Sequence, residues 1–258
     1  MTNDARTAEY ASLADPELAR SHGLFVAEGR LVVRRVIEDG RYAIRSLLLT
    51  TSAQRQLCAV LARLDPAVPV HVCPVQSFRD ITGFNLHRGC VALVARPAEL
   101  DADVLAQSAR LLVLLESIAN PDNVGGIFRN AAAFGADGVL HDATTCDPLY
   151  RKAIRTSMAA TLRVPFARVQ WPDALPKLRA MGYTIAALTP HERAESLDRF
   201  AHKPRPRRLA LLLGNEGDGL SAAAVASADV LVRIPMNSDV DSLNVAVAAG
   251  ILLYELRA

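Results

Sequence analysis

The sequence lacks the cysteine patterns that mark metal-binding and disulfide-rich proteins. Its four cysteines, Cys58, Cys73, Cys90 and Cys146, are scattered and form no CxxC pair. This spacing fits neither a zinc site nor a disulfide framework, so we expect free thiols in a reducing cytoplasm and no metal ion. The first thirty residues carry charges throughout and contain no apolar segment typical of a signal peptide. No apolar run reaches membrane-spanning length, so we expect a soluble, cytoplasmic protein that does not associate with membranes.

The motifs of several common enzyme classes are also missing. The chain has no GxSxG elbow, no HExxH motif and no Walker loop. It does have a Gly-rich segment, but Gly214, Gly217 and Gly219 do not have the GxGxxG spacing of a dinucleotide-binding loop. His141 ends an apolar run and is either a site residue or a core histidine. The sequence therefore contains no motif of a conventional active site.

The length allows one large domain or two modest ones, and the alternation of predicted helices and strands divides the chain near residue 100 into two α/β parts. The chain has 258 residues, of which 51% are hydrophobic, so each domain can have a real core. We predict a first domain over residues 1–96, a linker over 97–110 and a second domain over 111–258. In the first domain we expect strands at Ile44–Leu49, Val68–Val72 and Cys90–Ala95, and helices at Gly29–Glu38, Ser52–Leu64 and Ser77–Thr82.

The second domain contains continuous apolar strands separated by helices, which indicates a parallel sheet covered on both faces. The expected strands are Leu111–Leu115, Val139–His141, Thr184–Leu188, Leu209–Leu213 and Val230–Ile234. The expected helices are Val124–Phe134, Leu149–Ala160, Ser221–Ser227 and Asn244–Leu256. Asp122 or Asn123 is expected to cap the first of these helices, and Gly135 to stop it. The basic segment His202–Arg208 is expected to be a solvated connector.

Two loops of the second domain follow apolar strands and suit close contact with a ligand. Gly214–Gly219 (GNEGDG) follows one strand, and a second loop runs from Ile234 to a small-residue helix that begins at Asn244. The carboxyl ends of parallel strands meet at one edge of the sheet, where α/β proteins bind small ligands. Because glycine lets the backbone approach a ligand closely, we expect a crevice for a flat, polar molecule.

Arg129 lies inside the helix that follows Asn120–Asn123, among the apolar neighbours Ile127 and Phe128. Two interpretations are open for it. An arginine on such a helix is commonly a surface charge whose stem covers apolar area. Alternatively, a guanidinium held at an edge or crevice can bind a phosphate through two hydrogen bonds.

Three segments resemble the three signature motifs of the SpoU/TrmH class of SPOUT RNA 2′-O-ribose methyltransferases. They are Asn120–Asn130 (NPDNVGGIFRN), Leu213–Leu220 running on to Met236 (LGNEGDGL and RIPM), and Ser242–Glu255 (SLNVAVAAGILLYE). Their order and spacing agree with the family over Leu111–Arg257. Arg151–Ala160 (RKAIRTSMAA) is similar to the family's Arg-x-Ser-x-Gly-Ala stretch, and Phe25–Gly29 and His87–Cys90 are similar to a ribosomal-protein-like domain that binds substrate in many members.

The resemblance implies S-adenosylmethionine as methyl donor and a ribose 2′-hydroxyl of rRNA or tRNA as acceptor. It also implies a homodimer and a deep trefoil knot in the α/β domain, which residue patterns alone do not predict. Position by position, the catalytic residues it implies are Asn123, Arg129, Glu216, Ser242 and Asn244. The cofactor-binding residues it implies are Gly214, Glu216, Gly217, Ile234, Pro235, Met236 and Leu243. The family proposal has Arg129 act as the base or assist it. Because the pKa of an arginine lies far above neutral, we expect Arg129 to orient the substrate phosphate and to lower the pKa of the hydroxyl, and whether it also takes the proton stays open.

The chain departs from the family at two positions. Ala159 stands where glycine is usual, and Ser238 replaces a common glycine in a loop that also carries Asp239 and Asp241. We expect a local adjustment of the loop rather than loss of cofactor binding.

Two other functions stay open. A non-catalytic RNA-binding or ribosome-assembly relative would keep the fold, and a knotted methyltransferase could modify a base nitrogen. The presence of Arg129, Glu216, Ser242 and Asn244 argues against the first, and the Asn123–Arg129 pairing favours ribose over the second. The net charge of +2 requires any RNA-binding surface to be local. Its candidate phosphate contacts in the first domain, each otherwise a solubilising charge, are Arg20, Arg30, Arg34, Arg35, Arg41 and Arg88.

Overall fold

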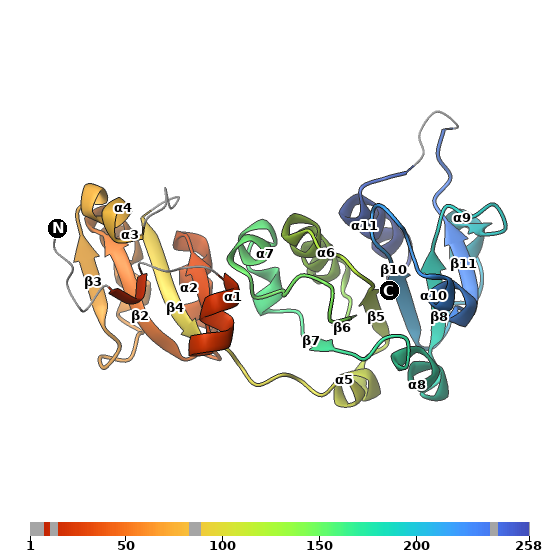
Figure 1. The fold of residues 1–258 in the computed structure, drawn as a ribbon, viewed down its shortest axis with the longest axis horizontal. Coiled ribbons are helices and arrows are strands. Elements are labelled where there is room, and N and C mark those ends of the chain that lie inside the picture. Colours follow the sequence, from red (N-terminus) through yellow and green to blue (C-terminus); the bar gives the residue numbers. More distant parts are fainter. Residues whose placement is uncertain (1–7, 11–14, 83–88, 238–241, 258) are drawn as a thin grey trace. The chain divides into compact units, whose positions relative to one another are not determined.

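The computed structural model describes residues 8–10, 15–82, 89–237 and 242–257, and it divides into two compact units (Figure 1). The first unit comprises Met1–Ala98 together with Leu149–Ala159, and the second comprises Glu99–Pro148 together with Ala160–Ala258. The chain therefore passes from one unit to the other three times. In the described segments no helix is long and apolar enough to cross a membrane.

The first unit has a four-stranded mixed sheet in the order β1-β4-β2-β3. Its strands are β1 (Leu24–Glu28), β2 (Ile44–Thr50), β3 (Val70–Cys73) and β4 (Cys90–Ala95); β4 is antiparallel to β1 and β2, and β3 is parallel to β2. Its helices are α2 (Arg30–Asp39), α3 (Thr51–Leu61) and α4 (Val75–Thr82), with short turns η1 (Ala8–Tyr10), α1 (Asp15–Glu17) and η2 (Leu18–His22). The predicted strands and helices are confirmed within a few residues, whereas β1 was not predicted.

One segment expected in the second domain belongs instead to the first unit. The helix predicted over Leu149–Ala160 is shorter, α7 (Arg151–Thr156). Its arginines Arg151 and Arg155 lie 3.6 Å and 3.8 Å from the buried carboxylate of Glu28 at the end of β1. The helix stops because Met158 and Ala159 adopt left-handed backbone conformations, with φ of 54° and 64°. Glycine takes this conformation most readily, which fits the sequence-based expectation of glycine at the position of Ala159.

The second unit has a seven-stranded sheet in the order β7-β6-β5-β10-β8-β11-β9, and all its strand pairs are parallel as predicted. The strands are β5 (Leu111–Leu115), β6 (Gly138–His141), β7 (Phe166–Arg168), β8 (Thr184–Leu188), β9 (Glu195–Ser196), β10 (Leu209–Leu213) and β11 (Val230–Arg233). The two central strands, β5 and β10, are buried along their whole length, which requires their continuous apolar sequences. The short strands β7 and β9 were not predicted.

Helices α5 (Ala102–Ser108), α8 (Ala174–Ala180) and α10 (Ala222–Ser227) contribute to one core cluster with the sheet. Helix α5 lies inside the predicted linker 97–110, and this helix was not predicted. Asp101 caps this helix by accepting hydrogen bonds from the backbone N–H groups of Asp103 and Val104. Aspartate is a preferred residue at this position, so the sequence contains a signal for the start of the helix. The unit also contains η3 (Ala160–Leu162) and α9 (Leu197–Ala201).

The basic segment His202–Arg208 is only partly a solvated connector. Arg208 donates hydrogen bonds to the carbonyls of Met181 and Gln107 and stacks on the ring of Tyr183. Lys203 pairs with Glu195. Lys203 and Arg208 therefore anchor the segment to neighbouring parts of the second unit.

Helices α6 (Pro121–Phe134) and α11 (Val245–Glu255) pack against each other at close range. A side chain on Gly126 would place its Cβ 2.7 Å from the Cβ of Ala246, so only glycine fits there. The Nδ2 of Asn130 donates to the carbonyl of Ala246 at 2.7 Å. This contact brings the first and third motif segments together, although they are more than a hundred residues apart in the chain.

Helix α6 begins one turn earlier than predicted. Asn120 caps it by accepting a hydrogen bond from the N–H of Asp122, and Pro121 occupies the first turn, where its missing N–H costs nothing. The expected cap at Asp122 or Asn123 is therefore wrong. The expected stop at Gly135 is confirmed, with φ of 76°.

Candidate functional site

A cleft of about 450 Å³ lies at the carboxyl ends of β8, β10 and β11. Its size falls in the range of small-molecule sites. The residues that line it are Leu188, Thr189, Pro190, Leu213, Gly214, Asn215, Glu216, Gly217, Asp218, Gly219, Leu220, Ile234, Met236, Ser242, Leu243, Val245 and Ala248. Apolar side chains and loop backbone thus surround a space at the edge of the sheet where the sequence predicted a crevice.

Most of the residues expected to hold a cofactor line this cleft, namely Gly214, Glu216, Gly217, Ile234, Met236 and Leu243. Pro235 does not line it. The cleft is also lined by Leu188–Pro190, at the end of the predicted strand Thr184–Leu188. The sequence predicted this strand but not that its end belongs to the site. Its place in the cleft depends on β8 lying between β10 and β11, an order that no local pattern reveals.

The Gly-rich loop folds back on itself, and this shape requires Gly214. A Cβ on Gly214 would lie 2.6 Å from the backbone of Gly219 and Leu220. The N–H of Gly219 donates to the carbonyl of Asn215 at 3.0 Å, and the side chain of Asn215 accepts from the N–H of Gly217 at 2.7 Å. The loop therefore presents a compact backbone surface to the cleft.

One hydrogen-bond network joins the three motif segments. The Nδ2 of Asn244 donates to Oδ1 of Asn123 at 2.9 Å and to Oε1 of Glu216 at 2.6 Å. The Oδ1 of Asn244 accepts from the N–H groups of Ala246 and Val247, so the same side chain caps α11. Asn123 is only 5% exposed. Each segment thus contributes one side chain to a network beside the cleft, and Asn123 and Asn244 take part without lining the cleft itself.

Arg129 lies on an exposed position of α6. It makes no hydrogen bond or ion pair with any residue in the part of the chain that the structure describes, and it does not line the cleft. Among the described residues its guanidinium thus has no partner, and phosphate binding by it stays a prediction. Ser242 is exposed and lines the cleft. Ser238, Asp239 and Asp241 lie outside the described residues.

His141 is a core histidine. Its side chain is buried, and its Nδ1 lies 2.8 Å from the carbonyl oxygen of Asp142. Burial lowers the pKa of this imidazole below its ordinary value, so the ring is neutral near pH 7. His141 does not line the cleft, which favours the core interpretation over a site role.

The arginines proposed to bind RNA differ in their surroundings. Several contact other groups: Arg20 the carbonyl of Pro16, Arg30 the side chain of Gln56, Arg35 the carbonyl of Met158, and Arg41 the carboxylate of Asp39. Arg34 is exposed, without a hydrogen bond or ion pair to a described residue. Arg88 lies outside the described residues. Of this set, Arg34 is the most readily available to a phosphate.

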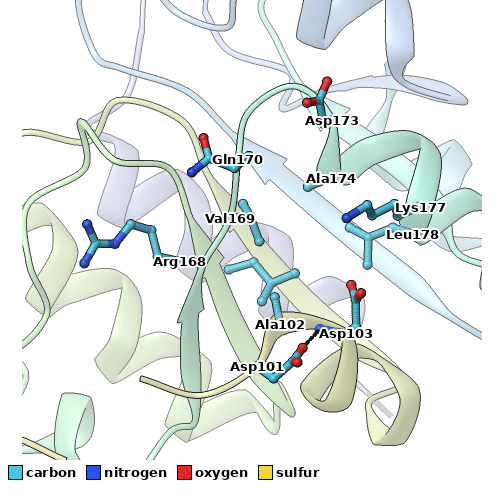
Figure 2. Close-up of a pocket in the computed structure, with 11 residues that line it drawn as sticks. Asp101, Ala102, Asp103, Arg168, Val169, Gln170, Asp173, Ala174, Lys177 and Leu178 are labelled. Atoms are coloured by element: carbon cyan, nitrogen blue, oxygen red, sulfur yellow. Dashed lines mark hydrogen bonds between the residues drawn. The ribbon is translucent and has the colours of Figure 1, made fainter. Parts of the chain in front are cut away.

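A second, smaller cavity of about 240 Å³ lies between α5, the end of β7 and α8 (Figure 2). Asp103 and Lys177 flank it, and Gln170 and Asp173 come from the loop after β7. It shares no lining residue with the first cleft, and no predicted site residue lines it. Within the described segments there is also no group of three or more His, Cys, Asp or Glu side chains arranged to hold a metal ion.

Comparison with known proteins decides the family. Residues 110–254 match the SpoU rRNA Methylase family. An uncharacterized tRNA/rRNA methyltransferase of Mycobacterium tuberculosis is 39% identical over 241 residues, which cover 93% of this chain and 83% of that protein. The chain belongs to the SpoU rRNA methylase family. The resemblance of its three motif segments to SpoU enzymes is thereby confirmed.

Two further similar proteins bear on the chemistry. The 23S rRNA (guanosine(2553)-2′-O)-methyltransferase RlmP of Bacillus subtilis is 28% identical over 194 residues, which cover 75% of each protein. The crystal structure of an AdoMet-bound rRNA methyltransferase from Sinorhizobium meliloti has a TM-score of 0.80 and 26% identity, and covers 99% of this chain and 95% of that one. As a SpoU-family member the chain is an RNA methyltransferase, and the expected cofactor, S-adenosylmethionine, is confirmed for it.

Proposed function

We propose that this SpoU-family protein transfers a methyl group from S-adenosylmethionine to a ribose 2′-hydroxyl of structured RNA, either rRNA or tRNA. The observation that carries the proposal is the network in which Asn244 contacts both Asn123 and Glu216 beside the cleft. The relative RlmP is named as a 2′-O-methyltransferase, which supports ribose as the acceptor.

The cleft fits the cofactor in size and chemistry. Its apolar residues, among them Leu188, Leu213 and Leu243, suit an adenine ring, and its exposed loop backbone suits the polar edge of that ring. The glycines Gly214 and Gly217 line the cleft from one loop, and Ile234 and Met236 line it from another. Pro235 lies between Ile234 and Met236 and restricts the backbone there. When bound, the cofactor supplies a methyl group on a positively charged sulfur that becomes neutral on transfer.

The chain's own residues prepare the acceptor. A ribose hydroxyl is a poor nucleophile, so it has to be positioned and its pKa lowered. Arg129, exposed and without a partner among the described residues, orients a substrate phosphate through paired hydrogen bonds and stabilises negative charge on the attacking oxygen. Glu216, Asn123 and Asn244 hold the polar side of the site in one arrangement, and Ser242 offers a hydroxyl at the cleft.

The first unit holds the RNA by contacts to its backbone and shape, with Arg34 as the most available phosphate contact. The chain passes through a trefoil knot around α11. The close packing of α11 on α6, and the return of Asn244 to residues of two earlier loops, support this path. The cytoplasmic location expected from the sequence stays a prediction.

The active form is a homodimer that uses the outer face of α11. This helix is apolar on nearly every side, and such helices are ordinarily buried. Val247 and Tyr254 nevertheless are 52% and 49% exposed, and with Ile251 they form one stripe. A second copy of the chain would cover this stripe.

Val247→Glu is therefore expected to shift the protein from dimer to monomer, because a buried carboxylate at a packed apolar interface is strongly disfavoured. Sedimentation velocity measures this directly. Val104→Glu is the matched control, since Val104 is 63% exposed on α5 and away from α11; it should leave the dimer unchanged. Wild-type protein that sediments as a monomer throughout would contradict the dimer.

The function itself is tested by transfer of labelled methyl groups from S-adenosylmethionine to unmodified rRNA and tRNA, followed by nucleoside analysis. A 2′-O-methylnucleoside is the expected product. A base-methylated nucleoside would instead identify the base-modifying alternative. Absence of product together with absence of cofactor binding in calorimetry would identify the non-catalytic RNA-binding alternative.

A further inference from the structure

Glu116 is a buried acid that the proposed reaction does not use. It directly follows β5 and is only 5% exposed. Its two carboxylate oxygens have different partners: Oε1 accepts from the indole Nε1 of Trp171 at 2.7 Å, and Oε2 accepts from the backbone N–H of Ser221 at 2.9 Å. A buried carboxylate needs such donors to offset the loss of water.

The bond to Ser221 fixes the end of the cleft-lining loop. Ser221 follows Leu220 directly and caps α10, where its Oγ accepts from the N–H of Ala224 at 3.1 Å. The beginning of the same loop is fixed by Asn215, whose Nδ2 donates to the carbonyl of Ser117 at 3.0 Å. Both ends of the loop are thus held by the consecutive residues Glu116 and Ser117.

This anchor is itself firmly held. Ser117 has a positive φ of 59°, a conformation that persists only where surrounding contacts impose it. The carboxylate of Asp142 accepts from both the N–H and the Oγ of Ser117, at 3.1 Å and 3.2 Å. Burial alone would raise the pKa of Asp142, but hydrogen bonds from Thr144, Thr145 and the backbone lower it overall, so it stays ionised at neutral pH.

We propose that Glu116 is a positioning residue that sets the shape of the loop Gly214–Leu220 for cofactor binding, and that Trp171 reports the state of that loop. The proposal rests on the proposed cofactor cleft. Two accepting oxygens are needed because both partners donate, and an amide would offer an N–H to one of two N–H donors. Trp171 is the single tryptophan of the sequence, so all tryptophan emission of the protein comes from a group hydrogen-bonded to Glu116.

The test combines calorimetry and tryptophan emission during titration with S-adenosylmethionine. In the wild type, tryptophan emission is expected to change during the titration, and the midpoint of this change should equal the midpoint measured by calorimetry. Glu116→Gln should raise the Kd about tenfold, the effect of one lost hydrogen bond to a charged group, and should greatly reduce the emission change. Trp171→Phe, which keeps the bond to Ser221, should raise the Kd less, about threefold.

Tyr183→Phe separates positioning from a general loss of stability. The hydroxyl of Tyr183 is buried and donates to the carbonyls of Ala106 and Ala109, away from the cleft. This variant should lower the melting temperature while leaving the Kd and the emission change at wild-type values. Folding of every variant is checked by circular dichroism.

The possible failures can be told apart. If the wild type releases no heat with S-adenosylmethionine, the proposed cleft is wrong and the role of Glu116 falls with it. If the wild type binds but folded Glu116→Gln has the wild-type Kd, the cleft stands and the positioning role is wrong. If the wild type binds and the emission stays constant at saturation, the link from the loop to Trp171 is wrong.

Discussion

Arg129→Ala is expected to slow methyl transfer about 100- to 1000-fold while leaving the Kd for S-adenosylmethionine within about twofold of the wild type. Arg129 is an exposed cation on α6 with no hydrogen bond or ion pair to a described residue, and it does not line the cleft. In the proposed reaction its loss removes a contact to the RNA phosphate and to the developing negative charge, and because Arg129 does not line the cleft the cofactor should still bind. Single-turnover methylation at saturating cofactor measures the rate, and calorimetry measures the Kd.

Two further variants sharpen this result. Arg129→Lys keeps the charge but loses the paired donors of a guanidinium, so it should recover only a minor part of the rate. Arg110→Ala is the matched control, because Arg110 is also exposed but lies at the amino end of β5, the opposite edge of the sheet from the cleft. A wild-type rate in Arg129→Ala, or an equal loss in Arg110→Ala, would remove Arg129 from the proposed reaction.

Gly214→Ala is expected to raise the Kd for S-adenosylmethionine about 10- to 100-fold. The added Cβ would lie 2.6 Å from the backbone carbonyl of Gly219 and from the backbone nitrogen of Leu220, neither of which can swing aside as a side chain does. The loop has to open, and the backbone surface that faces the cleft is lost. Calorimetry gives the Kd, and circular dichroism verifies that the rest of the sheet is intact.

Gly217→Ala is the internal comparison for this prediction. The same loop carries both glycines, but a Cβ on Gly217 would meet only the Oδ1 of Asn215, at 3.5 Å, which is an ordinary contact. Its Kd should rise much less than that of Gly214→Ala. Equal Kd values for the two variants would show that the tight fold of the loop at Gly214 does not matter for binding.

The periodicity of the sequence predicted the elements that are long and strongly apolar. The strands Leu111–Leu115, Thr184–Leu188 and Leu209–Leu213 have the predicted bounds, because a strand buried in a parallel sheet is a short, largely apolar run that stands out between polar residues and glycine. The short strands β7 and β9 and the linker helix α5 were missed. Their few apolar residues give no clear period, and they form because the sheet and the helices beside them supply the contacts.

For the candidate site, the sequence likewise predicted some features and not others. The glycines and polar residues of the three motif segments were identified from the sequence, and most of the expected cofactor residues line the cleft. The hydrogen bonds between these residues were not identified. No local pattern predicts that Asn244 contacts both Asn123 and Glu216, or that Glu116 accepts a hydrogen bond from Ser221. The cap of α6 was misplaced because Asn120, Asp122 and Asn123 are all good capping residues, and only backbone geometry selects Asn120.

By itself, the sequence determined the family, the two α/β regions and the parallel sheet, and it supplied the residues that we propose for methyl transfer, since these depend on residue type and spacing along the chain. Only the tertiary structure decided that Leu149–Ala159 joins the first unit, that β8 lines the cleft between β10 and β11, and that Glu116 accepts a hydrogen bond from Ser221. These features depend on contacts between residues tens to more than a hundred positions apart. Such contacts follow from the order of strands and the packing of helices, which local sequence patterns do not encode.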